Sequence, residues 1–99
     1  MSYSALLAEH QRLSLLRALA DSPRYNANDS ILRDQLAVFG LEASRDQVRG
    51  HLSWLAEQGL VTIEQLVGTT QVATLTERGH DAAAGNAYVP GVKRPGPRG

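Results

Sequence analysis

The sequence predicts a mainly helical protein with a small β-hairpin, in the order α-α-α-β-β-α, followed by an extended C-terminal tail. Three observations support this class. Residues 44–58 carry helix-capping residues at both ends and an apolar stripe between them. Two short apolar runs flank a turn at Gly68, as expected for a hairpin. Residues 86–99 are rich in proline and glycine and cannot continue a helix.

Length and composition limit the possible classes of protein. The chain has 99 residues, which corresponds to one domain, residues 1–85, and the tail, residues 86–99. It contains no cysteine, so disulfides and thiolate metal sites are excluded. No apolar run approaches the ~18 residues that span a bilayer, and the N-terminus has neither a basic region nor a long apolar segment. We therefore expect a cytoplasmic protein without membrane association.

Charge is unevenly distributed along the chain. The formal net charge is zero, from ten Lys and Arg against ten Asp and Glu. Three of the basic residues, Lys93, Arg94 and Arg98, lie in the tail, which leaves a mildly acidic body. Nucleic-acid binders are usually basic on the binding face, so the totals do not favour DNA binding, although a local basic patch suffices for it.

Residues 4–20 are expected to form the first helix, with Ser2 or Ser4 as the N-cap. The helix carries two apolar stripes, where a lone surface helix needs one. One consists of Leu6, Leu13, Leu16 and Ala20, and the other of Leu7, Leu15, Ala18 and Leu19. Either the helix is buried deep in a small core, or the second stripe forms the seam of a homodimer. A core of this size has little room to cover a helix on two sides, so the homodimer is kept as an expectation.

The second helix is expected after a loop over residues 21–28, which is rich in turn-forming residues. Asn28 or Asp29 is a suitable cap, and the helix runs to about Phe39. Gly40 suits the left-handed position after a helix C-terminus. The apolar stripe of this helix consists of Leu32, Leu36 and Phe39.

The third helix, residues 44–58, has the clearest pattern in the chain. Ser44 is a good N-cap, and Gly59 suits the position just after the C-terminus. Its inward stripe consists of Val48, Leu52 and Leu55. Strands at residues 60–65 and 71–75 follow as a hairpin, and a last helix, residues 77–84, lies between Thr76 and Gly85. This order predicts a winged helix-turn-helix, with the hairpin as the wing.

Residues 48–61, VRGHLSWLAEQGLV, resemble the recognition-helix motif of ArsR-like repressors, roughly V-S-R-H-L-x-x-L-x-E-x-G-L-V. The matching positions are Val48, His51, Leu52, Leu55, Glu57, Gly59, Leu60 and Val61. Residues 75–85, LTERGHDAAAG, resemble the L-T-x-x-G segment that follows the wing in the wider MarR, PadR and ArsR group. The whole chain, with its Val-Pro-Gly-Val-Lys-Arg-Pro tail, also looks like the small winged-helix proteins of Mu-like transposable phages.

The resemblance implies a dimeric transcription factor whose recognition helix enters the major groove and whose wing contacts the DNA backbone or minor groove. ArsR-like sensors often carry cysteine metal sites, which this cysteine-free chain cannot form, so metal sensing is not carried over. The family's Ser and Arg after the first Val are Arg49 and Gly50 here, so no base contact is carried over from those positions.

When the apolar stripe of the third helix packs against the core, several polar side chains of residues 44–58 face outward. These side chains are candidates for DNA contact. Base contacts are expected from Gln47, Arg49 and Ser53, and phosphate contacts from Ser44 or Arg45. Asp46 and Glu57 lie on the same face and repel phosphates. The tail is expected to be extended, held only by Tyr88, Val89 and Val92 where they find a groove. Its Lys93 and Arg94 either lie along a phosphate backbone or in a minor groove, stay solvated, or dock on a protein in polyproline form.

A competing hypothesis is a protein-interaction module that uses the same fold without binding DNA. The wing tip, residues 66–70, contains no Lys or Arg, although phosphate contacts dominate DNA affinity. Trp54 lies on the outward flank of the third helix, where packing on the wing or on a partner protein is more common than stacking on a base. Gly50 faces outward without a core-packing reason, which suggests either close approach of a ligand or neutral drift.

Metal binding and catalysis find little support in the sequence. His10, His51 and His80 lie on three different predicted helices, without a metal-ligand spacing. There is no glycine-rich phosphate loop, no nucleophile motif, and no carboxylate pair that stands out. We therefore expect no cofactor, no metal and no enzymatic activity.

Overall fold

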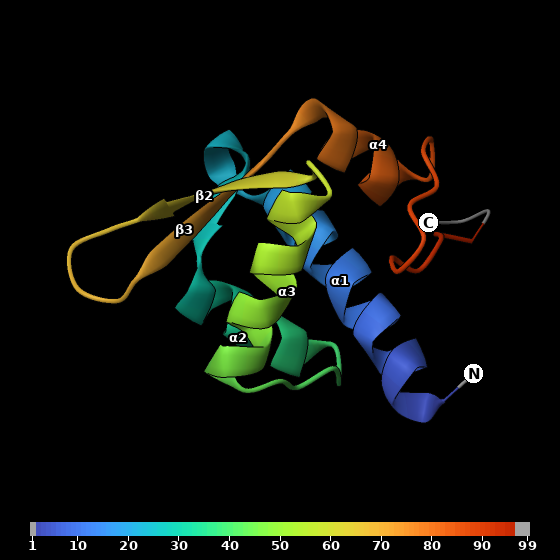
Figure 1. Cartoon of the computed structure of the whole chain (residues 1–99), viewed down its shortest axis with the longest axis horizontal. Helices are drawn as coiled ribbons and strands as arrows, with labels where there is room; N and C mark the ends of the chain where they lie inside the picture. Colours follow the sequence, from blue (N-terminus) through green and yellow to red (C-terminus); the bar gives the residue numbers. More distant parts are fainter. Residues whose placement is uncertain (1, 97–99) are drawn as a thin grey trace.

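The computed structural model describes residues 2–96 (Figure 1). Its helices are α1 (Tyr3–Asp21), α2 (Asp29–Val38), α3 (Arg45–Glu57) and α4 (Glu77–Ala84), with a 3₁₀ turn at Pro23–Tyr25. Its strands are β1 (Asn26–Asn28), β2 (Val61–Gln65) and β3 (Gln71–Leu75), in the antiparallel sheet order β1-β3-β2. The predicted fold class and the order of the predicted elements are confirmed, and β1 is an addition to them.

The long helix α1 is the centre of the fold, because α2, α4, β1 and β3 all contact it. Leu15 and Leu19 have no exposed surface, so the expectation that they form a dimer seam is wrong. Both pack inside the chain's own core together with Leu13 and Leu16. Of the expected seam, only Leu7 and Ala18 keep partial exposure. The alternative interpretation, a helix buried deep in a small core, describes α1 correctly.

The segment before α2 contains the strand β1, where a loop over residues 21–28 was expected. Its three residues pair with β3, with Asn26 opposite Thr74 and Asn28 opposite Val72. Asparagine has low strand propensity, so the local sequence does not predict this strand. Pairing with the free edge of β3 determines it, and Tyr25 just before it packs edge-on against His80 at a ring-centre distance of 4.4 Å.

Phe39 lies outside the apolar stripe that was predicted for the second helix. Leu32 and Leu36 are fully buried, whereas Phe39 is 62% exposed. The physical reason is that α2 ends at Val38, so Phe39 is the C-cap and turns away from the core. Gly40 then takes a φ of 72° and reverses the chain. Leu41 donates its N–H to the Leu36 carbonyl and packs on the core in the place expected for Phe39.

Helix α3 forms as the sequence predicts. Ser44 and Gln47 make a complete capping box, in which each side chain bonds the other residue's backbone N–H. The stripe of Val48, Leu52 and Leu55 is fully buried. Gly59 follows with a φ of 76° and leads into β2.

The wing consists of β2, β3 and the loop between them, which projects from the body on the left of Figure 1. The strands pair from Val61 opposite Leu75 to Gln65 opposite Gln71. Beyond the last pair, the side chain of Val67 is 102% exposed. The tip of the wing therefore has an apolar side chain in full contact with solvent.

Residues 86–96 fold back along α1, at the opposite end of the molecule from the wing (Figure 1). Gly85 ends α4 with a φ of 84°. Val89 and Val92 are buried in the core, whereas Tyr88 is exposed. The N–H of Lys93 donates to the Glu9 carbonyl at 3.2 Å. The described part of the tail is thus packed on the body by two apolar side chains.

Among residues 2–96, none of the helices has the length and apolar character needed to cross a bilayer.

Two glycines in helices give a matched test of this packing. At Gly79 of α4, an added Cβ would collide with the Leu60 carbonyl oxygen and with Leu75. Gly79→Ala should therefore lower the free energy of unfolding by about 2–3 kcal/mol. At Gly50 of α3 an added Cβ meets nothing within 4 Å, so Gly50→Ala should raise it by about 0.5–1 kcal/mol. Urea unfolding measures both, and shifts of equal sign would contradict this account of the two sites.

Candidate nucleic-acid interface

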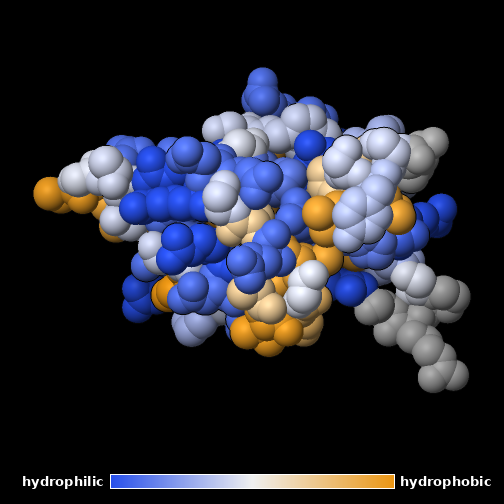
Figure 2. Space-filling model, turned by 90° about the horizontal axis from the view of Figure 1, so that it is seen from below, coloured by the Kyte–Doolittle hydropathy of each residue, from blue (hydrophilic) through white to orange (hydrophobic). Residues whose placement is uncertain are grey.

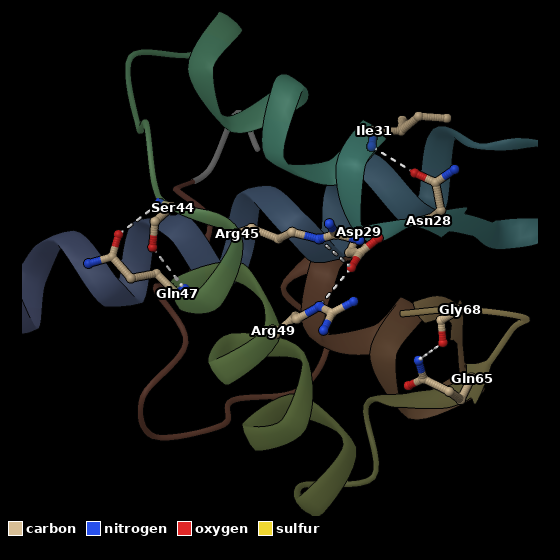
Figure 3. A network of polar contacts seen from close by, with 9 residues as sticks. All are labelled: Asn28, Asp29, Ile31, Ser44, Arg45, Gln47, Arg49, Gln65 and Gly68. Atoms are coloured by element: carbon tan, nitrogen blue, oxygen red, sulfur yellow. Dashed lines mark hydrogen bonds and ion pairs between the residues drawn. The ribbon is translucent and has the colours of Figure 1, made fainter. Parts of the chain in front are cut away.

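A buried carboxylate links α2 to α3 on the side of the molecule that carries the wing (Figure 3). Asp29, the first residue of α2, is 0% exposed. Its Oδ2 accepts from Arg49 Nε at 2.8 Å and from Arg45 Nε at 3.4 Å. The two arginines are four residues apart on α3, so they lie on one side of that helix. Asp29, Arg45 and Arg49 are called the arginine cluster below.

The arginine cluster carries one net positive charge. Burial by itself raises the pKa of Asp29, but the hydrogen bonds and positive charges of Arg49 and Arg45 outweigh it and lower that pKa below its usual value. Asp29 is therefore ionised at neutral pH. The side chains of Arg45 and Arg49 are 40% and 26% exposed, but the Nη2 atom of Arg49 is buried. A ligand can therefore reach Arg49 only through Nη1.

Each arginine bonds Asp29 through Nε. Within residues 2–96, the terminal nitrogens of Arg45 and Arg49 make no hydrogen bond to protein. These nitrogens form the part of a guanidinium that binds phosphate or a guanine edge in two-bond geometry. The cluster thus fixes two guanidinium groups side by side. In the described part of the chain, both terminal nitrogens of Arg45 are free of protein hydrogen bonds, whereas Arg49 offers only Nη1, because its Nη2 is buried.

The other α3 residues expected at DNA have different surroundings. The Ser44 hydroxyl accepts from the Gln47 N–H at 3.1 Å, and Gln47 Oε1 accepts from the Ser44 N–H at 2.9 Å. Both side chains therefore hold the helix N-terminus, although the amide nitrogen of Gln47 keeps its two donors. Ser53 is exposed on the outer face. Asp46 and Glu57 are exposed there as well, as the helical projection predicts.

Asp29 is the residue of this site that the sequence analysis missed. It appeared there only as an alternative to Asn28 for the cap of α2, and Asn28 is the cap, since its Oδ1 accepts from Ile31 N at 2.8 Å. The available signal was an acidic residue in the first turn of one helix and two arginines at i and i+4 on the next. That pattern predicts an ion pair only once the two helices are known to cross at these positions.

A second polar cluster joins α1, α3 and the tail on the opposite flank of α3. The Arg12 guanidinium lies 4.2 Å from the centre of the Trp54 ring, in a cation–π contact. Its Nε donates to His51 Nδ1 at 3.2 Å, and its Nη1 donates to the Gly91 carbonyl at 2.9 Å. His51 Nε2 lies 2.9 Å from Gln11 Oε1. These residues are called the tail clamp below.

The tail clamp accounts for Trp54 within the chain itself. Gly91 has a φ of 99°, and an added Cβ would lie 2.6 Å from the Trp54 ring. The tail backbone therefore passes directly over the tryptophan, and only glycine allows that approach. Trp54 packs on Arg12 and the tail, where packing on the wing or on a partner protein was expected.

The basic residues of the tail do not join the arginine cluster. Lys93 is half-buried beside α1, and Arg94 is exposed next to it. In Figure 1 this part of the tail and the wing lie at opposite ends of the molecule. Lys93 and Arg94 thus lie on a different side of α3 from Arg45 and Arg49. Arg98, the third basic residue of the tail, lies outside the described residues.

The three histidines lie in three different places. His51 belongs to the tail clamp, His80 packs on Tyr25, and His10 lines a groove between α1 and α2. Within residues 2–96, no three His, Asp or Glu side chains are grouped in a way that could hold a metal ion.

Comparison with solved structures places this fold among the winged-helix proteins. RosR of H. salinarum matches with a TM-score of 0.66 and 21% identity, over 77% of this chain and 67% of that one. Sco3205, a MarR family transcriptional regulator from Streptomyces coelicolor solved in complex with DNA, matches with a TM-score of 0.59 and 22% identity. That match covers 79% of this chain but only 55% of Sco3205. At this identity the similarity establishes the fold alone.

Sequence similarity defines the family. The uncharacterized protein gp26 of Escherichia phage Mu is 55% identical over 93 residues, which cover 94% of this chain and 95% of gp26. An uncharacterized protein of Haemophilus influenzae is 50% identical over 78 residues, which cover 79% of this chain and 76% of that protein. No protein-family model matches the chain. The chain belongs to the family of phage Mu gp26, and the predicted resemblance to small winged-helix proteins of Mu-like phages is confirmed.

The arginine cluster should make stability depend on acid pH. Because the pKa of Asp29 is lowered in the folded state, its contribution is complete above the ordinary carboxyl pKa of about 4 and is lost as the pH falls through the folded value. Asp29→Asn should lower the free energy of unfolding by about 1–3 kcal/mol at pH 7, because two partly exposed arginines lose a charged hydrogen-bond acceptor, with a smaller difference from wild type at pH 3. Urea unfolding of wild type and Asp29→Asn at pH 7 and at pH 3 measures this difference. Asp34→Asn, an exposed carboxylate on the same helix, is the control and should have little effect.

The tail clamp should make stability depend on pH in a higher range. Burial, and secondarily the charge of Arg12, lower the pKa of His51 below the ordinary histidine value of 6.5. The unfolded chain therefore binds the proton more readily, and stability should fall as the pH decreases below about 6.5. His51→Gln should flatten this dependence between pH 7 and 5. Trp54 is the only tryptophan of the chain, so its fluorescence reports the change, and identical pH profiles for the two proteins would contradict this role.

Proposed function

We propose that this protein is a winged-helix regulator that binds double-stranded DNA, with residues 44–58 in the major groove and the wing beside the DNA backbone. The observation that carries the proposal is the arginine cluster. Two guanidinium groups, held side by side by a buried carboxylate, lie on α3 on the side of the wing. The proposal is also supported by the fold, which this chain shares with Sco3205 in complex with DNA.

Asp29 prepares the two arginines for a ligand. An arginine side chain loses considerable rotational freedom when it binds, and that cost is smaller when the guanidinium is already fixed. Arg49, with the shorter bond to Asp29, is the better candidate for a base edge, because fixed donors discriminate between bases. Its contact is a single bond through Nη1, since Nε bonds Asp29 and Nη2 is buried. Arg45 is more exposed and lies in the first turn of α3, where a phosphate contact is expected. Gln47 and Ser53 supply further donors from the same helix.

The charges around the arginine cluster limit the number of phosphate contacts. Asp46 and Glu57 are exposed on α3, and the wing carries Glu64 but no Lys or Arg between residues 61 and 75. Two or three phosphate contacts correspond to a slope of about −2 to −3 in a plot of log affinity against log salt. We therefore expect modest affinity with a shallow dependence on salt. Lys93 and Arg94 contribute attraction at a distance, from the other side of α3.

A second candidate function, a protein-interaction module, is favoured by the wing tip. Val67 and Leu66 are exposed at that tip, and Figure 2 shows the apolar surface at the far left of the molecule, where the wing lies. A DNA-binding wing usually contacts phosphates through basic side chains, which this tip lacks. Val67→Ser separates the two functions, because it should leave DNA affinity unchanged and weaken only a protein contact.

The test is binding of the full chain to a random-sequence duplex at several salt concentrations. Wild type should bind at about 50 mM salt, and its affinity should fall with added salt. Arg49→Gln and Arg45→Gln should each weaken binding by about 1–3 kcal/mol. Arg24→Gln removes the same charge at an exposed position outside the arginine cluster and is the control, for which a smaller loss is expected.

Circular dichroism must show that the variants are folded, because Arg49 also supports Asp29. Arg49→Lys keeps a positive charge but loses the planar group that can bond Asp29 through Nε and a base through Nη1. It should therefore retain general DNA affinity and lose preference among sequences. The proposal fails if wild type shows no binding at about 50 mM salt. It also fails if folded Arg45→Gln and Arg49→Gln bind as well as Arg24→Gln.

A further inference from the structure

Three buried polar atoms at the junction of α2, α3 and the wing have no hydrogen-bond partner within residues 2–96. They are Asp29 Oδ1, Arg49 Nη2 and Gln71 Oε1. A buried polar atom without a partner costs free energy, and folded proteins pair nearly all such atoms. The bond between Asp29 and Arg49 uses other atoms, since Oδ2 accepts from Nε at 2.8 Å. The three atoms therefore require a partner besides the bonds of the arginine cluster.

The register of the sheet brings Gln71 to the side of Asp29. Gln71 is the first residue of β3. Asn28 lies opposite Val72 in the antiparallel pairing of β1 with β3, so the next residue, Asp29, continues toward Gln71. Because side chains alternate along a strand, Gln71 lies on the same face of β3 as Ala73, which is fully buried. The wing thus presents this glutamine to the carboxylate from the core side of the sheet.

The chemistry of the three atoms determines which ligand fits between them. The carboxylate and amide oxygens are acceptors, whereas Arg49 Nη2 is a donor. A metal ion would meet the positive charge of Arg49, and an anion would meet the oxygens of Asp29 and Gln71. One water molecule donates two hydrogen bonds and accepts a third, so it satisfies all three atoms at once. Buried waters in proteins typically bond about three otherwise unpaired polar groups.

We infer that one water molecule is buried between α2, α3 and the wing, bonded to Asp29 Oδ1, Arg49 Nη2 and Gln71 Oε1. Asp29 holds the Arg49 guanidinium at Nε (Figure 3), and the water holds it at Nη2. Two corners of the planar group are then fixed, and Nη1 remains for a ligand. Gln71 is a positioning residue, because it acts on Arg49 through the water and contacts no ligand itself.

The water couples the wing to α3. Gln71 directly follows the wing loop, residues 66–70, whose ends are joined by a bond from the Leu66 N–H to the Thr70 carbonyl at 2.8 Å. A displacement of the wing therefore moves Gln71 and changes the direction of the Arg49 side chain. This consequence rests on the proposed function, in which Arg49 contacts a base edge and the wing lies beside the DNA backbone. The wing then contributes to sequence preference without a basic side chain of its own.

A crystal structure of the full chain at atomic resolution tests the water directly. Wild type should show one ordered water molecule within about 3.2 Å of each of the three atoms. Gln71→Met keeps a long unbranched side chain but removes the amide acceptor, and this variant should lose the water. A wild-type structure without this water, whether or not Gln71 bonds Asp29 directly, would overturn the inference.

A double-mutant cycle, measured by urea unfolding, tests the coupling across the water. Arg49→Lys keeps a positive charge for Asp29 but has no Nη2, and Gln71→Met removes a second partner of the water. Each single change should lower the folding equilibrium constant by about 5-fold or more. In the double variant this constant should be at least about 5-fold higher than two independent effects would give, because the second change finds a site that is already lost.

Gln65→Met is the matched control for this cycle. Gln65 is the exposed glutamine opposite Gln71 in the wing, and its amide bonds the Gly68 carbonyl. Its effect and that of Arg49→Lys should be independent to within about 2-fold. Equal independence of Gln71→Met and Arg49→Lys would overturn the inference.

DNA binding tests the positioning role of Gln71. Gln71→Met should bind a random-sequence duplex as wild type does, because it removes no charge. Its preference for a duplex that wild type selects from a random library should fall by about 5-fold or more, whereas Gln65→Met should keep that preference. An unchanged preference in folded Gln71→Met would overturn the positioning role. A wild-type chain that binds no DNA would refute the proposed function alone, since the crystal structure and the cycle decide the water site without DNA.

Discussion

The enclosure of α1 is the constraint on which the other features of this structure depend. A 19-residue helix in a chain of 99 residues needs cover on most of its sides. Part of α1 is covered by segments whose own sequences do not predict a regular structure. The short strand β1 extends the sheet, and the tail adds Val89 and Val92 to the core. Two parts of α1 stay less covered: the first turn, residues 3–6, is exposed, and the face along the groove, from His10 to Asp21, is only partly buried.

The arginine cluster shows a conflict between stability and binding. A carboxylate without solvent contact needs compensation by positive charge, and Arg49 and Arg45 provide it. The same two side chains are the best candidates to bind an anion outside the protein. If only Nε were available, the two roles would exclude each other, but a guanidinium has further donors on its terminal nitrogens. Stability and binding can therefore use different atoms of one residue.

The sequence predicts features that depend on neighbouring residues and misses those that depend on long-range contacts. The capping box of Ser44 and Gln47 and the reversal at Gly59 arise within a few residues, so α3 is predicted almost to its ends. β1 is missed, since only pairing with β3 defines it. Phe39 was assigned to the core because the periodicity continues past the point where α2 stops.

The same distinction applies to the candidate site. Helical periodicity correctly predicts which residues of α3 lie on its outer face and flanks. It does not predict that Arg45 and Arg49 turn toward Asp29, because the partner is contributed by another helix. The tail clamp is missed for the same reason, since Gly91 and Arg12 are 79 residues apart in the chain.

The two clusters together determine how a ligand can approach α3. Asp29 holds one flank of the helix through Arg45 and Arg49, and the tail clamp holds the other flank through His51 and Trp54. The centre between them carries Asp46, Gly50, Ser53 and Glu57, which together are acidic and mostly short. A polyanion centred on that face would meet two carboxylates. One displaced toward α2 and the wing would meet the two arginines instead. The electrostatics of α3 thus favour an off-centre approach of a polyanion, and the missing side chain at Gly50 leaves space beside that flank.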